Sequence, residues 1–238
     1  MELYVLQEEL EKALNTVSRF LSTNPQLPIF SHIIIVAEKG KLKLLATNLE
    51  IGISFTIGAN VKTDGKTAVH GKTLQELISN LPKGKLNLKQ DDGKLIISSN
   101  NYSINIQTTP PNDFPDFNFK ISGQKNNLLL NLINDISQKI VFSSSHQDLK
   151  PVYSGVLFLP KNNTVSVVST DGVRLSKKDL KENLNITGKV IMPSNVISEI
   201  SKIFADYQSV NFFIDNQENQ VLFYSDNIIL SSRLIDGE

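Results

Sequence analysis

The chain repeats itself with an offset of 123 residues, as from Pro28 to Pro151, and this repeat constrains its fold more strongly than any other sequence feature. The segment 28–35 (PIFSHIII) aligns without a gap with the segment 151–158 (PVYSGVLF), and apolar positions fall on apolar positions. A repeat of this length in a chain of 238 residues predicts two copies of one fold of ordinary domain size. We therefore expect domains at residues 1–123 and 124–238.

Positions with helical spacing follow the same offset. Apolar residues at i, i+4, i+7 and i+11 recur in both copies, which is the period of an amphipathic helix. They are Leu6, Leu10, Ala13 and Val17 in the first copy and Leu129, Ile133, Ile136 and Ile140 in the second. In the first copy we predict helices at residues 7–21 and 72–81, the second ended by Pro82 and Gly84.

Strands account for most of the remainder of each copy. Apolar runs and alternation in the first copy predict strands at residues 29–36, 41–46, 51–57, 85–89, 94–98 and 102–107. Asp91-Asp92-Gly93 suits a hairpin turn between two of these strands, because Asp followed by Gly tolerates positive φ. Two helices and many strands per copy indicate an α+β fold, in which the helices cover one sheet face and the opposite face meets solvent or a partner.

Composition narrows the class of protein. The chain has no cysteine, so it forms no disulfide and no thiolate metal site. His32, His70 and His146 lie far apart in the sequence, so we expect no zinc site and no other metal centre. The N-terminus lacks a basic segment followed by an apolar one, and no apolar run approaches about 18 residues. These features predict a cytoplasmic protein without a membrane partner.

The charge balance does not announce a nucleic-acid partner. Lysine plus arginine equal aspartate plus glutamate at 24 each, and neither half of the chain is basic. Any contact with DNA would have to come from local placement of charge, and it would be weak and sensitive to salt.

Two short motifs resemble parts of enzyme sites but lack what those sites need. The segment 70–73 (HGKT) resembles the end of a phosphate-binding loop, yet Lys66 stands where that loop requires a glycine. The segment 143–148 (SSSHQD) offers serines and a histidine, but sequence neighbours rarely hold the geometry of a nucleophile, a base and an orienting group. We predict no catalytic residue, no cofactor and a protein that is not an enzyme.

The segment 169–176 (STDGVRLS) is the most informative octapeptide. Thr-Asp-Gly predicts a turn between two strands, with glycine supplying the permissive backbone. An arginine and an apolar residue follow on the next strand, and Tyr153 comes near if the strands of the repeat pair as neighbours. Such a surface could hold an apolar side chain of a bound peptide while nearby backbone supplies hydrogen bonds.

Four short segments of the chain together resemble a known family. The segments 46–50 (ATNLE), 112–115 (NDFP), 146–150 (HQDLK) and 170–175 (TDGVRL) are similar, in order and spacing, to signatures of the bacterial DNA sliding clamp, the β subunit of DNA polymerase III. The resemblance covers the whole chain. It implies a DNA-clamp fold, a ring made by two subunits of three such domains each, and a role as processivity factor of DNA replication.

The resemblance also implies a contact with double-stranded DNA that does not depend on sequence. In such rings helices line the hole and meet phosphates through mobile side chains and water, so the ring slides. The candidate helix cations are Lys12, Arg19, Lys72, Lys139 and Lys202. Two DNA-touching loops would map to Asn24, where the family often has an arginine, and to Gln147 through Lys150.

The family's cleft for short linear motifs would map to Tyr153, Thr170, Gly172, Val173, Arg174 and Leu175. Val173 replaces a frequent histidine and Tyr153 a common leucine, so motif preference is expected to differ. Implied partners are the polymerase catalytic subunit, the clamp loader and repair factors. The edge strand around Ile104 and Ile106 would pair with another subunit in the homodimer of the full-length protein.

The family has three copies of the fold, and this sequence contains two. We expect that a truncated sequence explains this better than a natural two-domain clamp, and that residues 1–238 alone do not close a ring. Two alternatives of other classes stay open: a clamp-fold protein-interaction module that does not encircle DNA, and a serine hydrolase that uses His146.

Overall fold

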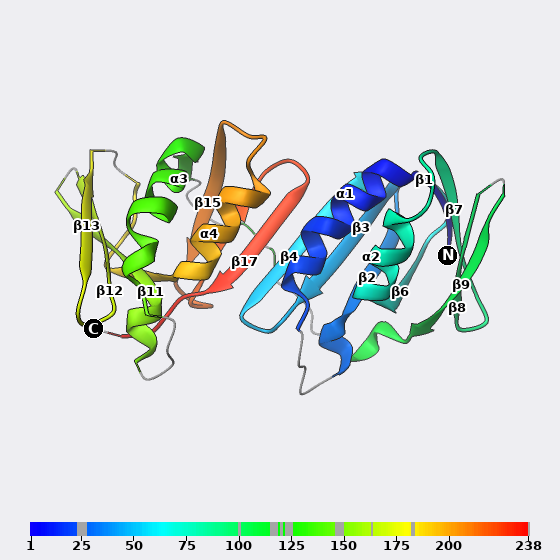
Figure 1. The fold of residues 1–238 in the computed structure, drawn as a ribbon, viewed down its shortest axis with the longest axis horizontal. Helices are drawn as coiled ribbons and strands as arrows, with labels where there is room; N and C mark the ends of the chain where they lie inside the picture. The colour runs from blue at the N-terminus through cyan, green and yellow to red at the C-terminus, as the bar shows by residue number, and fades with distance from the viewer. Residues whose placement is uncertain are drawn as a thin grey trace. The chain divides into compact units, whose positions relative to one another are not determined.

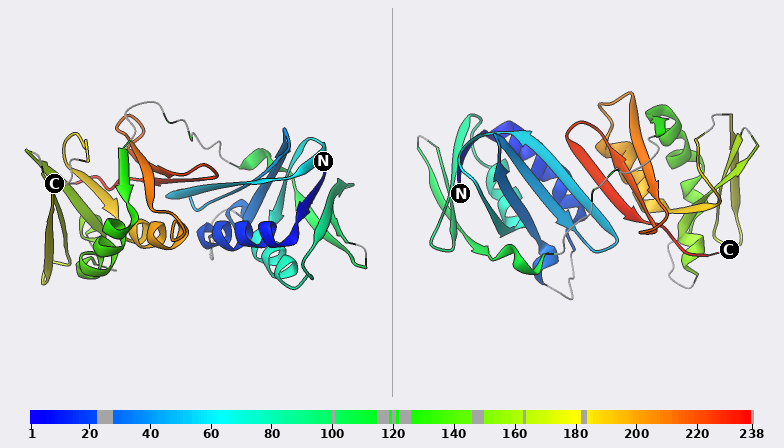
Figure 2. Two further views of the ribbon diagram at one scale, coloured as in Figure 1. Left: turned by 90° about the horizontal axis from the view of Figure 1, so that it is seen from above. Right: turned by 180° about the vertical axis from the view of Figure 1, so that it is seen from behind.

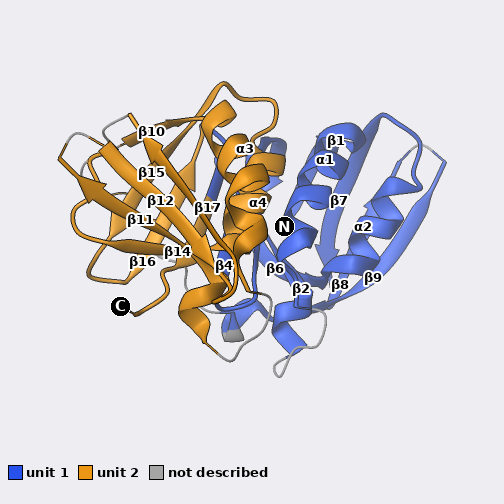
Figure 3. Cartoon of the chain, turned by 60° about the vertical axis from the view of Figure 1, so that its left-hand side comes forward, with its two compact units in different colours: residues 1–118, 226–229 blue, residues 119–225, 230–238 orange. Residues whose placement is uncertain are grey.

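The computed structural model describes residues 1–22, 28–99, 101–114, 119, 121, 126–145, 150–162, 164–181 and 184–237. The chain forms two compact units (Figure 3). Unit 1 comprises Met1–Asn118 and Asp226–Ile229, and unit 2 comprises Phe119–Ser225 and Leu230–Glu238. The domain boundary expected at residue 123 lies outside the described residues and stays a prediction.

Unit 1 combines antiparallel strands with two helices (Figure 1). The strands are β1 (Glu2–Leu6), β2 (His32–Glu38), β3 (Lys41–Thr47), β4 (Ile51–Gly58), β5 (Asn60–Thr63), β6 (Gly65–His70), β7 (Lys85–Asp91), β8 (Lys94–Ser98) and β9 (Ser103–Thr109). The helices are α1 (Gln7–Val17) and α2 (Gly71–Ser79), with short 3-10 turns η1 (Ser18–Phe20), η2 (Pro28–Ser31) and η3 (Pro111–Asp113). The hydrogen-bonded strand order in this unit is β4-β3-β2-β6-β9-β8-β7-β1-β5.

Unit 2 has the same plan. Its strands are β10 (Asn126–Leu129), β11 (Gly155–Lys161), β12 (Thr164–Thr170), β13 (Leu175–Leu180), β14 (Val190–Pro193), β15 (Ser209–Asp215), β16 (Gln220–Tyr224) and β17 (Ile228–Arg233). Its helices are α3 (Leu130–Lys139) and α4 (Ser194–Ile203), with 3-10 turns η4 (Val141–Ser143) and η5 (Pro151–Ser154). The strands are ordered β13-β12-β11-β14 and β10-β15-β16-β17.

The repeat predicted from the sequence is visible in the element bounds. Four pairs of elements differ by 123 residues at both ends, namely η1 and η4, η2 and η5, β2 and β11, and β3 and β12. In each unit both helices lie on one side of the strands (Figure 2). The predicted α+β arrangement therefore holds in both units.

Helix packing explains why these segments fold as they do. In α1 the positions Leu10, Ala13, Leu14 and Val17 are almost fully buried, and the helix packs against α2, β3 and β4. Fully burying a leucine side chain contributes about 1.5–3 kcal/mol, so this apolar stripe fixes the helix on the sheet. In α3 the stripe is carried by residues such as Ile133, which is 2% exposed.

The hairpin predicted at Asp91-Asp92-Gly93 is confirmed. Asp91 pairs with Lys94 in the β7–β8 ladder, which leaves Asp92 and Gly93 as the two turn residues. Their φ angles are 42° and 71°. Positive φ at both positions is the requirement of a tight hairpin turn whose twist matches that of the strands.

The predicted helix over residues 7–21 is too long. The α-helix ends at Val17, Ser18–Phe20 continue as a 3-10 turn, and Leu21 already has an extended backbone with φ −74° and ψ 141°. Phe20 is 3% exposed, so burial of this ring accompanies the change of direction. Apolar spacing alone could not locate this end, because the 3-10 turn continues the same buried face.

The strand predicted at residues 29–36 begins late, at His32. The segment Pro28–Ser31 forms η2, in which the Ser31 hydroxyl donates a hydrogen bond to the Pro28 carbonyl oxygen at 2.7 Å. Ile29 and Phe30 are nevertheless buried in a cluster with Ile34, Ala68 and Phe114. Their apolar side chains, which predict a strand, instead pack a 3-10 turn against the core.

Strands β1, β5 and β6 were not predicted. Strand β1 was missed because the helical spacing assigns Leu6 to the apolar stripe of the first helix. In the structure Leu6 ends β1 and immediately precedes α1. Leu6 is 55% exposed, and its repeat counterpart Leu129 is 48% exposed before α3. In both copies the first residue assigned to the helical stripe therefore lies just before the helix and outside its buried face.

Candidate functional site

The segment between β12 and β13 forms a tight turn in unit 2. Thr170 ends β12 and pairs with Leu175, which begins β13. The Thr170 hydroxyl donates to the carbonyl oxygen of Arg174 at 2.6 Å and accepts from the N–H of Gly172 at 3.0 Å. A threonine at the strand end thus closes the loop by hydrogen-bonding its own neighbours.

Asp171 fixes the remainder of the turn. Its Oδ1 accepts from the N–H groups of Val173 at 2.9 Å and Arg174 at 2.7 Å, while its Oδ2 accepts from the Arg174 side chain at Nε (3.0 Å) and Nη2 (2.9 Å). The main-chain N–H of Arg174, then that of Val173, then the Arg174 side chain lower the pKa of Asp171 from 3.8 to about 2. The carboxylate is therefore ionised throughout the physiological pH range.

Gly172 gives the turn its shape. Its φ is +90°, in the region that favours glycine. A Cβ atom at this position would lie 3.4 Å from Cε2 of Tyr153. The turn therefore lies close to the Tyr153 ring, as expected if neighbouring strands of the repeat pair. Tyr153 itself belongs to η5, which leads directly into β11, and β11 pairs with β12.

Two large apolar side chains of this segment face solvent. Val173 is 94% exposed and Leu175 is 66% exposed. Isolated exposed apolar residues are ordinary, but these two flank Arg174 on one hydrogen-bonded turn, whose Gly172 lies against the half-buried Tyr153, and they offer an exposed apolar patch. Such a patch can bind apolar side chains of a partner.

Lys150 lies at the same surface. Its ammonium nitrogen is 5.2 Å from the centroid of the Tyr153 ring, and its carbonyl oxygen accepts from the Tyr153 N–H at 2.9 Å. The family resemblance implies that Lys150 lies in a loop that touches DNA. The other residue expected there, Gln147, and Asn24 of the first expected loop lie outside the described residues.

The expected helix cations are exposed, and two of them pair with carboxylates. Lys139 of α3 lies 2.5 Å from Asp135, and Lys202 of α4 lies 2.9 Å from Glu199. Lys12, Lys72 and Arg19 are exposed on α1, α2 and η1. The four helices carry four lysines and six carboxylates, so their charge does not by itself attract phosphates.

The strand that carries Ile104 and Ile106 has an available edge. β9 pairs with β8 from Ser103 to Gln107, but with β6 only at Thr108 and Thr109. Along residues 103–107 no described strand pairs with the side opposite β8. Ile106 is 8% exposed, so its side chain serves the core and pairing with another chain would use the backbone.

The motif that resembles a phosphate-binding loop has a packing role. His70 is the N-cap of α2, and its ring accepts from the Thr73 N–H at 3.4 Å. A Cβ at Gly71 would lie 2.4 Å from Leu21 Cδ1 and 2.9 Å from Ile33 Cγ1. Close approach of the helix to these side chains explains the glycine without a bound phosphate.

The serines next to His146 also have structural partners. Ser143 Oγ lies 2.7 Å from Ser176 Oγ, and Ser144 Oγ donates to the Val141 carbonyl oxygen at 2.7 Å. His146 lies outside the described residues. Among the residues that are described, no group of three or more His, Cys, Asp or Glu could hold a metal ion.

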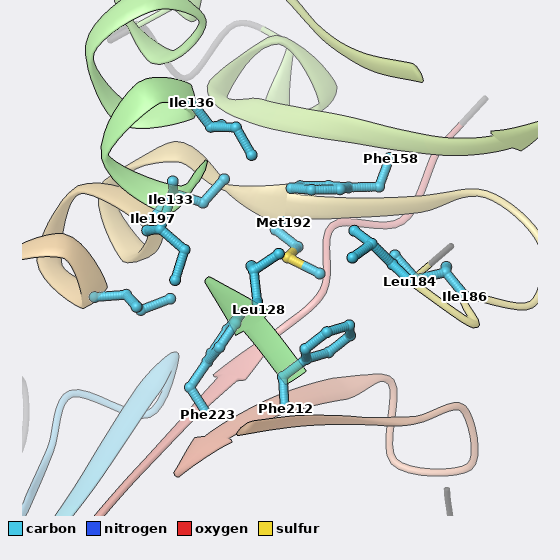
Figure 4. Close-up of a pocket in the computed structure, with 11 residues that line it drawn as sticks. Leu128, Ile133, Ile136, Phe158, Leu184, Ile186, Met192, Ile197, Phe212 and Phe223 are labelled. Carbon is cyan, nitrogen blue, oxygen red and sulfur yellow. The ribbon is translucent and has the colours of Figure 1, made fainter. Parts of the chain in front are cut away.

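A pocket inside unit 2 belongs to the core (Figure 4). Its lining is entirely apolar and includes Phe158, Met192, Phe212 and Phe223. The cavity of about 20 Å³ has room for little more than one water molecule. Without polar groups to hold a ligand it reflects imperfect packing between the helices and the strands.

No described helix has the length and apolar character needed to cross a membrane.

Asp171 is the residue of this surface that sequence reasoning did not single out. The Thr-Asp-Gly sequence predicts only a turn, whereas the spacing of Asp171 and Arg174 at i and i+3 is the sequence signal of their ion pair. The structure brings together Tyr153, Thr170 and the turn through Leu175, and it adds Lys150 to this set.

Two family models match the chain. The N-terminal domain of the DNA polymerase III beta subunit matches residues 1–121, and the central domain of that subunit matches residues 125–238. Among curated relatives, the beta sliding clamp of Buchnera aphidicola subsp. Rhopalosiphum padi is 29% identical over 250 residues, which cover 100% of this chain and 66% of the relative. That of Chlamydia pneumoniae is 24% identical and is covered to 65%.

Solved structures show the same similarity. A putative DNA polymerase III beta subunit from Eubacterium rectale is 28% identical with a TM-score of 0.93, and the match covers 100% of this chain and 66% of that one. The beta chain of DNA polymerase III from Streptococcus pneumoniae is 26% identical with a TM-score of 0.94, with 100% and 65% covered. The chain thus spans about two thirds of the length of these relatives.

Proposed function

Because the chain belongs to the DNA polymerase III beta subunit family, we propose that it acts as a sliding clamp. In this role it is a non-catalytic processivity factor that encircles duplex DNA and tethers the replicative polymerase. Its place of action is the cytoplasm, where bacterial DNA is replicated.

The observation that carries the tethering role is the apolar patch of Val173 and Leu175 on the turn whose Gly172 lies against Tyr153. Partner proteins that dock through short linear motifs need a small apolar surface and a few fixed polar groups. The turn from Thr170 to Leu175 supplies both, because its internal hydrogen bonds hold it in one conformation. We assign the motifs of the polymerase catalytic subunit, the clamp loader and repair factors to this surface.

A peptide-binding experiment tests this assignment. A labelled peptide from the C-terminus of the polymerase catalytic subunit of the same organism is titrated with the protein, and affinity is read from fluorescence anisotropy. Leu175→Ser should weaken binding about tenfold or more, since burying a leucine contributes about 1.5–3 kcal/mol. Leu49→Ser is the matched control, because Leu49 is 53% exposed in the corresponding turn of unit 1. Equal affinity of the Leu175→Ser variant and the control would show that the peptide does not bind at this surface.

DNA contact in the proposed clamp comes from the helices. Lys12, Lys72, Lys139 and Lys202 would reach phosphates through long side chains and water, so contact is weak and permits sliding. We further propose that a ring closes by pairing the free edge of β9, residues 103–107, with a second copy of the full-length protein.

A second candidate function is a protein-interaction module of the same fold that does not encircle DNA. The six carboxylates against four lysines on the helices favour it. Retention on DNA separates the two functions. If the full-length protein is a clamp, it stays bound to nicked circular DNA through gel filtration and is lost after the DNA is linearised, whereas an interaction module is not retained on either form.

A further inference from the structure

The turn that follows β12 has a counterpart in unit 1, between β3 and β4, at the offset of 123 residues. In that turn Asn48 Oδ1 accepts from the N–H groups of Glu50 at 3.1 Å and Ile51 at 2.8 Å. Thr47 Oγ1 donates to the carbonyl oxygen of Ile51 at 2.8 Å and accepts from the Leu49 N–H at 2.9 Å. These are the same bonds, position for position, as those in the unit 2 turn. An amide oxygen is therefore sufficient to build it.

In unit 2 a carboxylate stands in place of this amide, and an arginine lies next to the carboxylate. Asp171 corresponds to Asn48, and Arg174 corresponds to Ile51, whose side chain has no polar group. Asp171 Oδ1 makes the two backbone contacts of the turn, and Oδ2 is left for Nε and Nη2 of Arg174. The additional oxygen acts on the arginine side chain and not on the turn.

We propose that Asp171 is a positioning residue for peptide binding, which holds the Arg174 guanidinium in one orientation before a peptide arrives. This inference rests on the proposed peptide surface. Asp171 itself does not contact the peptide in this arrangement, because its two oxygens are occupied by the turn and by Arg174. Arg174 presents its remaining N–H groups to carbonyl or carboxylate acceptors of the peptide.

The exposure of Arg174 and the charge of Asp171 explain how this ion pair can raise the affinity for a peptide. The Arg174 side chain is 60% exposed, so without Asp171 it would sample many rotamers. Ordering a side chain of this kind on binding lowers affinity by about two- to tenfold. The Asp171 side chain is 20% exposed and stays ionised down to about pH 2, so the hold on Arg174 persists under all physiological conditions.

A double-mutant cycle tests the proposal. Asp171→Asn keeps the backbone acceptor that Asn48 supplies in unit 1, so it should fold and melt within a few degrees of the wild type. It should weaken binding of the labelled polymerase peptide about two- to tenfold. In the Arg174→Ala background the same substitution should leave affinity unchanged, because no guanidinium remains to be held. Unchanged affinity of Asp171→Asn alone, or an equal loss in both backgrounds, overturns the proposal.

A second measurement is independent of the peptide. In ¹⁵N relaxation experiments the Nε–H group of Arg174 should be rigid in the wild-type protein and mobile in Asp171→Asn, while the backbone N–H of Val173 stays rigid in both. A mobile Nε–H in the wild type overturns the proposal. If Arg174 is rigid and yet no peptide binds, the peptide surface under Proposed function fails and the positioning role fails with it. If the peptide binds and Asp171→Asn has no effect, the positioning role fails alone.

Discussion

The ammonium group of Lys150 lies 5.2 Å from the centroid of the Tyr153 ring, within the range of a cation–π contact. The same ring lies against the turn at Gly172, where a Cβ atom would be 3.4 Å from its edge. Lys150 therefore lies beside the proposed peptide surface, although the family resemblance implies that it belongs to a loop that touches DNA.

This position predicts the effect of removing the charge. Lys150→Met should weaken binding of the polymerase peptide about two- to fivefold, since an exposed cation–π contact contributes about 0.5–1 kcal/mol. Isothermal titration calorimetry measures the change. In the Tyr153→Ala background the substitution should have a smaller effect. Loss of DNA retention with unaltered peptide affinity would instead assign Lys150 to the DNA loop.

The backbone at Gly172 predicts that the two equivalent turns respond unequally to substitution. Gly172→Ala should lower the free energy of unfolding by about 1 kcal/mol, because an alanine at φ +90° is strained. Leu49→Gly removes a non-glycine residue at φ +77° in unit 1, and the relief of strain should offset the greater freedom of the unfolded chain. Urea unfolding followed by circular dichroism compares them. Equal destabilisation by both substitutions would contradict this reading of the turns.

The lowered pKa of Asp171 predicts a pH dependence of stability. Since its folded-state pKa of about 2 lies below the ordinary value of 3.8, its stabilising effect is complete above pH 3.8 and is lost as pH falls toward 2. The difference in melting temperature between the wild type and Asp171→Asn should therefore be largest above pH 4 and shrink toward pH 2. A difference that stays constant from pH 5 to pH 2 would show that the charge of Asp171 is not involved.

Lysines on the helices predict unequal contributions to DNA binding. Lys202 lies 2.9 Å from Glu199, whereas Lys72 has no carboxylate within ion-pair distance among the described residues. Lys72→Gln should reduce the slope of log affinity against log salt by about 0.9, the value of one phosphate contact. Lys202→Gln is the matched variant and should reduce it less. Identical slopes for both variants would mean that the neighbouring carboxylate does not matter.

Much of the fold could be predicted because the sequence contains the fold twice, so each element expected in one copy can be checked in the other. The offset that aligns Pro28 with Pro151 also relates η2 to η5 and β2 to β11 residue for residue. The errors arose where tertiary packing decides. Ile29 and Phe30 are buried by a 3-10 turn and not by a strand, and Leu6 is exposed although its spacing fits a helix stripe.

The candidate surface was predictable in part. The neighbouring strands explain why Tyr153 meets the turn, which the sequence anticipated from the repeat. The role of Asp171 could not be derived from the sequence, since Asn48 forms the same turn without a charge. It becomes apparent only when the side chain of Arg174 is placed beside the second carboxylate oxygen.

The most direct test of the clamp function is the length of DNA made in a single binding event. The full-length protein is loaded onto primed circular DNA by the clamp loader of the same organism, and the polymerase extends the primer in the presence of a trap for free enzyme. We predict long products that become short with Leu175→Ser, while that variant is still retained on the circular DNA. Products of equal length with and without the protein would contradict the proposed tethering role.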